Sequence, residues 1–111
     1  MIDWDRVAEM RDEIGAEEFG EVIDLFLLEV QGAIAALPDV QGDAAEMERQ
    51  LHFLKGAAMN LGFSALSSLC AKGETDCAAG RYDTITPAEV DHCFAQSRKA
   101  FESEYDRRFA A

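Results

Sequence analysis

The sequence predicts an all-α protein: an antiparallel up-down four-helix bundle with a short additional helix at its N-terminus. Apolar residues recur every three or four positions over most of the chain, and nowhere do they alternate with period two as in strands. Capping residues, glycines and prolines divide the 111 residues into five helical segments joined by short connections. Because a chain of this length has enough residues for only one core, we expect a single helical-bundle domain over residues 1–111.

The first predicted helix spans residues 3–13, and the second spans residues 16–37. Asp3 is a favourable N-cap for the first helix, and Gly15 separates the two. Pro38 is expected to end the second helix. The predicted core face of the second helix is a continuous apolar stripe made of Phe19, Val22, Ile23, Phe26, Val30, Ala33, Ile34 and Leu37.

The third predicted helix opens at a capping box formed by Asp43 and Glu46 and ends at Gly62. Its core stripe consists of Ala44, Met47, Leu51, Leu54, Ala58 and Leu61. The fourth helix follows at once and ends by Gly80. Its inward positions are Phe63, Leu66, Leu69, Cys70, Gly73 and Cys77.

The last predicted helix opens at a second capping box, formed by Thr86 and Glu89, with Pro87 at its first position. Its inward positions are Val90, Phe94, Ser97, Phe101 and Tyr105. Four long amphipathic helices with short loops pack most simply as an up-down bundle, and the short first helix then covers it as a lid.

The formal net charge of −12 is concentrated in the first half of the chain, where residues 1–50 contain 14 Asp and Glu and only 3 Arg. Such a surface repels polyanions, so nucleic acid and anionic membranes are poor partners. No apolar run approaches the ~18 residues of a membrane span, and the N-terminus lacks the pattern of a signal peptide. We therefore expect a cytoplasmic protein whose Cys70, Cys77 and Cys93 are reduced thiols.

His52 is the residue most able to carry chemistry, because the helical spacing places it on the outer side of the third helix. It lies about 130° from the centre of the core stripe, which argues against an ordinary core histidine. Lys55, three residues further on, is its neighbour on the helix surface. An exposed imidazole beside an ammonium group is poorly suited to a metal cation and well suited to an anionic group such as phosphoryl.

Gly56 lies within this helix without interrupting its stripe. Glycine inside a helix costs about 1 kcal/mol relative to alanine, so we infer that a partner approaches closely beside the histidine. Phe53 and Met59, which also lie off the stripe, are expected to form apolar docking surface. Leu25 and Leu28 lie on the far side of the second helix from its stripe, and they belong either to a docking patch or to the packing of the lid.

These residues resemble the motif of the histidine-containing phosphotransfer (HPt) family, H-x-x-K-G, then L-G, L and often C-x-x-L-E. The matching residues are His52, Lys55, Gly56, Leu61, Gly62, Leu66, Cys70 and Glu74. The resemblance covers essentially the whole chain. This chain departs from the pattern at Ala57, where the family often has serine, and at Gly73, where the family usually has an apolar residue. The second change is expected to loosen or kink the fourth helix.

The resemblance implies a phosphorelay intermediate. His52 would accept a phosphoryl group from the phospho-aspartate of one response-regulator receiver domain and pass it to the aspartate of another, with Lys55 stabilising the phosphoryl group. It also implies a hybrid histidine kinase upstream. No cofactor is expected on this chain, because the receiver would bring the magnesium ion. We expect a monomer. We also expect no autokinase activity, since no phosphate-binding loop for ATP is present.

Two other functions remain as alternatives. A metal site is disfavoured, because the cysteine spacing matches no zinc pattern and no His/Glu pairs recur on facing helices. The second alternative is a non-catalytic helical interaction module that docks a receiver or another partner, with His52 chemically idle. The intact set of His52, Lys55 and Gly56 argues against it.

Overall fold

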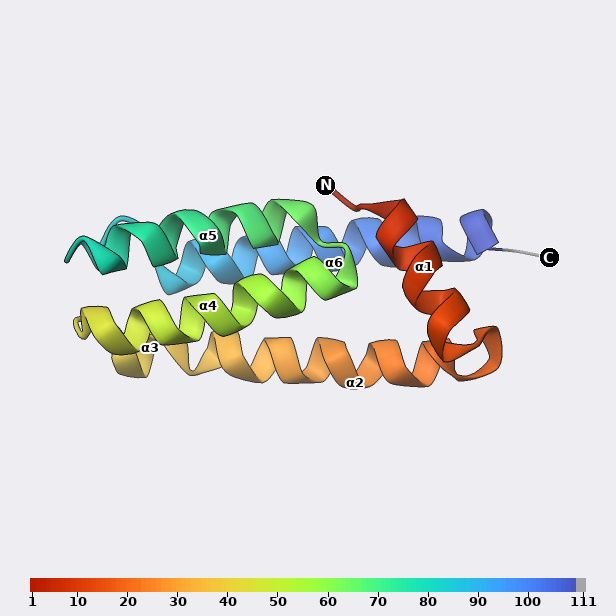
Figure 1. The fold of residues 1–111 in the computed structure, drawn as a ribbon, viewed down its shortest axis with the longest axis horizontal. Helices are drawn as coiled ribbons and strands as arrows, with labels where there is room; N and C mark the ends of the chain where they lie inside the picture. Colours follow the sequence, from red (N-terminus) through yellow and green to blue (C-terminus); the bar gives the residue numbers. More distant parts are fainter. Residues whose placement is uncertain (110–111) are drawn as a thin grey trace.

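The computed structural model describes residues 1–109, which are helical except for short connections and an isolated bridge between Ile2 and Phe63. Its helices are α1 (Trp4–Ile14), α2 (Ala16–Ala35), α3 (Leu37–Val40), α4 (Ala44–Leu61), α5 (Ser64–Ala78) and α6 (Pro87–Phe109). The four long helices α2, α4, α5 and α6 run alternately up and down along a body of 48 × 20 × 20 Å (Figure 1). This confirms the predicted bundle.

Helix α1 crosses one end of the bundle, where Figure 1 shows it beside the C-terminal part of α6. The Asp3 carboxylate caps α1 by accepting from the Arg6 N–H at 3.2 Å. The Asp3 N–H donates to the carbonyl of Gly62 at 2.7 Å, which ties the N-terminus to the end of α4. Gly62 has a φ of +77°, and a Cβ there would lie 2.7 Å from the Asp3 carbonyl oxygen. Only glycine combines this backbone conformation with this close approach.

Aromatic side chains from α6 hold α1 in place. The Trp4 ring stacks on Phe101 with ring centroids 5.6 Å apart, and Tyr105 stacks on Phe101 at 5.3 Å. Tyr105 is half-buried rather than fully buried, because α6 extends past the bundle at this end. Stacking of Trp4 on Phe101 stabilises the packing of α1 on α6 beyond the effect of burying apolar surface. The expected lid is therefore a packed part of the core.

One predicted helix boundary is wrong, and one predicted capping box is only half formed. Pro38 does not end the second helix; α2 stops at Ala35, and Pro38 lies in the first turn of the short α3. Proline suits that position, because its fixed φ is helical and a first-turn N–H has no partner in the helix. At α4 the Asp43 carboxylate accepts from the Glu46 N–H, but the Glu46 side chain pairs with Arg49 instead of completing the capping box.

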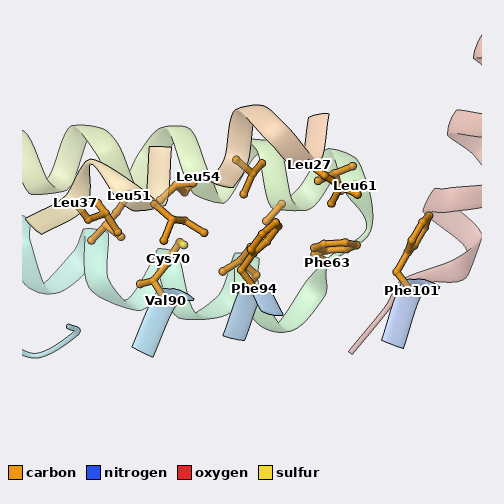
Figure 2. Packing of buried hydrophobic residues seen from close by; sticks show 14 of the residues in the cluster. Leu27, Leu37, Leu51, Leu54, Leu61, Phe63, Cys70, Val90, Phe94 and Phe101 are labelled. Atoms are coloured by element: carbon orange, nitrogen blue, oxygen red, sulfur yellow. The ribbon is translucent and has the colours of Figure 1, made fainter. Parts of the chain in front are cut away.

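The core is one cluster in which side chains from all the long helices meet. Figure 2 shows Leu51, Leu54 and Leu61 of α4 pointing toward the same interior as Val90 and Phe94 of α6. The buried residues of α2 are Phe19, Ile23, Leu27, Val30 and Ile34. Within residues 1–109, no helix is both long enough and apolar enough to cross a membrane.

The core stripe predicted for α2 is partly wrong. Leu27 is buried and was not predicted to be, whereas Val22, Phe26 and Ala33 are only half-buried. The helix is rotated so that Leu27 faces inward and Phe26 lies at the edge facing α4, where it lines a surface hollow.

The cysteines behave as small core residues. Cys70 and Cys77 are buried, and Cys93 is half-buried. Burial raises the pKa of the Cys70 thiol to about 12, so it is protonated at neutral pH and a poor nucleophile. Among residues 1–109, no group of three or more His, Cys, Asp or Glu side chains is arranged to hold a metal ion.

Asp76 joins the end of α5 to the connection that leads into α6. Its carboxylate accepts hydrogen bonds from Thr84 at 2.6 Å, Lys72 at 3.0 Å and Arg81 at 3.2 Å. These bonds, led by that of Thr84, lower the pKa of Asp76 from 3.8 to about 2. The ionised carboxylate is therefore the form that stabilises this end of α5.

We predict that Asp76→Asn lowers the melting temperature at pH 7. Because the folded-state pKa is depressed, the contribution of the carboxylate is present above its unfolded pKa of 3.8 and is lost as the pH falls toward about 2. The difference between variant and wild type should therefore narrow over that range in thermal melts. Asp83→Asn, in the same connection, is the control. A difference that stays constant with pH would contradict the assignment.

Candidate functional site

His52 lies on the outer face of α4, as the helical spacing predicts. Its side chain is 70% exposed, whereas the neighbouring Leu51 and Leu54 are completely buried. The apolar stripe fixes the rotation of α4 on the bundle, and that rotation holds the imidazole at the surface. The histidine therefore takes no part in core packing.

Glu74 of α5 joins the two predicted site residues of α4. Its Oε2 lies 2.8 Å from Nδ1 of His52, and its Oε1 accepts a hydrogen bond from Nζ of Lys55 at 2.9 Å. The Glu74 side chain is only 20% exposed and that of Lys55 is 26% exposed. One carboxylate thus holds an imidazole and an ammonium group one helical turn apart.

The charge of Glu74 determines how His52 is oriented. The pKa of Glu74 is lowered, chiefly by the hydrogen bond from Lys55 and further by the bond to His52. Partial burial raises this pKa but does not outweigh the two bonds. An ionised carboxylate can only accept, so Nδ1 of His52 carries a proton and its N–H donates a hydrogen bond to Glu74. The neutral ring then has its lone pair on Nε2, the nitrogen free to act as a nucleophile.

Close packing of α4 against α5 makes this contact possible (Figure 1). Gly73, directly before Glu74, is buried, and a Cβ there would lie 2.8 Å from Cδ1 of Leu51. The hydroxyl of Ser67 also donates to the Lys55 carbonyl at 3.4 Å. Gly73 was expected to loosen or kink α5, but α5 is continuous through it. The missing side chain instead lets the two helices approach.

A surface hollow of about 340 Å³ borders the imidazole on the side of α2. Its lining residues are Phe26, Glu29, Val30, His52, Phe53, Gly56, Ala57 and Asn60. A Cβ on Gly56 would meet no atom within 4 Å, so this glycine leaves open space beside the histidine. The hollow is mostly apolar and lies between two helices, as binding sites on helical bundles often do.

The structure brings together only some of the predicted docking residues. Phe53, 43% exposed, lies with Gly56 in the hollow beside His52. Met59 is exposed but lines a different hollow near the turn between α4 and α5. Leu25 and Leu28 are exposed on α2, and neither lines the hollow at the histidine.

The residues at the site that were not among the predicted ones include Glu74, Phe26 and Glu29. Glu74 matches the family motif but has no predicted role, and its position directly after an inward glycine on a partly polar helix is the signal that could have found it. Phe26 was assigned to the core stripe, and Glu29 has no distinguishing pattern in the sequence.

Fold and site together define a helical-bundle module built around one surface histidine. The model of the Hpt domain family matches residues 5–108 of the 111-residue chain. The chain therefore belongs to the Hpt domain family, as its motif predicted. Hpt domains are histidine phosphotransfer modules of phosphorelays rather than kinases, and they generally interact with receiver domains. No curated protein and no solved structure gives a significant match.

The two glycines near the site should respond to alanine with opposite signs. Gly56→Ala should raise the free energy of unfolding by up to about 1 kcal/mol, because the methyl group enters open space and alanine favours the helix. Gly73→Ala should lower it by about 1 kcal/mol, because overpacking against Leu51 outweighs the gain in helix propensity. Urea denaturation of both variants checks this, and stabilisation by both would contradict the close packing at Gly73.

Proposed function

We propose that this protein is a phosphorelay intermediate. His52 accepts a phosphoryl group from the phospho-aspartate of one receiver domain and passes it to the aspartate of a second receiver. The observation that carries the proposal is the contact between Nδ1 of His52 and the Glu74 carboxylate at 2.8 Å, on a ring that is otherwise exposed. In the neutral ring, this contact favours the proton on Nδ1 and the lone pair on Nε2, on a side chain accessible to a partner.

The transfer needs no general base on this chain. The Nε2 lone pair attacks phosphorus, an N–P bond forms, and the bond from phosphorus to the aspartyl oxygen breaks, returning its electrons to the receiver carboxylate. The ring keeps its proton on Nδ1 and becomes a cation, which the Glu74 carboxylate stabilises. Transfer to the second receiver is the reverse of these steps. Positioning and charge stabilisation are the main requirements of phosphoryl transfer.

Lys55 supplies positive charge beside the transferring group. Its ammonium is held by Glu74 at 2.9 Å, one helical turn from His52. We propose that it contacts phosphoryl oxygens during transfer, while the receiver brings the aspartate and its magnesium ion. Because Glu74 restricts the lysine side chain before transfer, little side-chain entropy is lost when it binds phosphoryl.

Docking is proposed to use the hollow next to His52. Phe53 provides exposed apolar surface there, and Gly56 provides room for a partner's side chain. Met59, Leu25 and Leu28 lie outside this hollow and stay proposed docking residues, because each is more than half exposed. Apolar groups of this kind usually form the centre of a protein interface.

We propose that the protein lacks autokinase activity, receives its phosphoryl group from a hybrid histidine kinase, and acts as a cytoplasmic monomer. Its net charge of −12 favours protein partners over nucleic acid or anionic membrane. A non-catalytic docking module is the second candidate, because the apolar hollow could bind a partner without any phosphoryl transfer.

We predict that His52→Gln abolishes labelling of the protein by a phosphorylated receiver, with the fold unchanged because residue 52 lies outside the core. The measurement is transfer of radiolabelled phosphate that is acid-labile and base-stable. His92→Gln, which removes the other histidine, is the matched control and should be labelled normally. Labelling that survives in His52→Gln or disappears in His92→Gln would overturn the assignment. A wild type that binds receivers without being labelled would favour the docking module.

A further inference from the structure

A second hollow borders His52, on the side where α4 faces α5. It is lined by Ala45, Glu48, Arg49, His52 and Glu74. Side chains on a helix lean toward its N-terminus, so the imidazole lies over the turn that carries residues 48 and 49. This hollow is separate from the apolar one that contains Phe53 and Gly56.

The residues that line this hollow carry more negative than positive charge, which disfavours a phosphoryl group there. Two of its lining residues, Glu48 and Glu74, are acidic, and Arg49 is the only Lys or Arg among them. A phosphoryl group on Nε2 of His52 adds close to two negative charges at neutral pH. Lys55 already donates to Glu74 at 2.9 Å. The phosphorylated ring therefore needs a further cation on the side of Glu48.

Arg49 is positioned to supply that cation, and only an exposed ion pair holds it elsewhere. It lies three residues before His52, a spacing that brings Cβ atoms to about 5–6 Å on a helix. Its side chain is 69% exposed and pairs with Glu46, one turn further from the histidine. Exposed pairs of this kind hold their partners weakly. The planar guanidinium can donate two parallel hydrogen bonds to phosphoryl oxygens.

We propose that Arg49 leaves Glu46 when His52 is phosphorylated and binds the phosphoryl oxygens, on the side of the ring opposite to the receiver-docking hollow. Lys55 and Arg49, one turn on either side of His52, then hold the group together. The inference rests on the proposed function of His52. It makes Arg49 a phosphoryl-binding residue of the phosphorylated state, with no covalent role.

The test is a ³¹P NMR titration of the full chain after phosphorylation with phosphoramidate, a small donor that needs no receiver. A cation in contact with the phosphoryl group favours its dianion and lowers its pKa. We expect Arg49→Gln to raise that measured pKa by at least about 0.5, and Arg49→Lys to restore part of the difference. Arg6→Gln breaks another Arg–Glu pair three residues apart, between Arg6 and Glu9 on α1, and should leave the pKa unchanged.

Glu46→Gln separates a phosphoryl contact from a structural role of the Arg49 pair. If Arg49 binds phosphoryl, releasing it from Glu46 leaves the phosphoryl pKa equal to or below that of wild type. If the pair only supports α4, Glu46→Gln raises the pKa as Arg49→Gln does, and the inference is wrong. An unchanged pKa in Arg49→Gln also overturns it, and leaves the proposed function standing. A wild type that is not phosphorylated on His52 contradicts the proposed function and the inference together.

Discussion

The site depends on one carboxylate that accepts from two groups at once. Glu74 binds Nδ1 of His52 through one oxygen and Nζ of Lys55 through the other. The first bond fixes which ring nitrogen carries the proton, and the second holds the ammonium group one turn away. Without Glu74, an exposed histidine and a partly exposed lysine would each sample many rotamers. An imidazole with a defined tautomer and a defined neighbouring charge therefore follows from a single side chain on α5.

That carboxylate is useful only if α5 lies close to α4 and in the correct rotation. Gly73 permits the approach, because any side chain there would meet Leu51, the residue before the histidine. The end of α5 is fixed in turn by Asp76, whose carboxylate accepts hydrogen bonds from Lys72, Arg81 and Thr84. The core and the site are therefore coupled: buried residues at positions i−1 of both His52 and Glu74 determine where the two side chains meet.

Much of the fold could be predicted from local patterns. The caps at Asp3 and Thr86, the stop at Gly62 and the outward direction of His52 all follow from interactions or angles within one helix. The contact between His52 and Glu74 could not be predicted in the same way, because 22 residues separate them and their distance depends on how two helices are rotated against each other. The prediction that Phe26 rather than Leu27 is a core residue is wrong for the same reason. Which of two neighbouring positions on α2 faces the core depends on the rotation of the helix against the bundle.

Glu74 holds the neutral ring of His52 with its proton on Nδ1 and its lone pair on Nε2. Two-dimensional ¹H–¹⁵N NMR of the imidazole, recorded at a pH where the ring is neutral, measures this tautomer directly. We expect a ring nitrogen shift typical of N–H for Nδ1 and of an unprotonated nitrogen for Nε2, with this preference reduced in Glu74→Ala. A wild-type ring protonated mainly on Nε2, or a tautomer ratio that Glu74→Ala leaves unchanged, would contradict it.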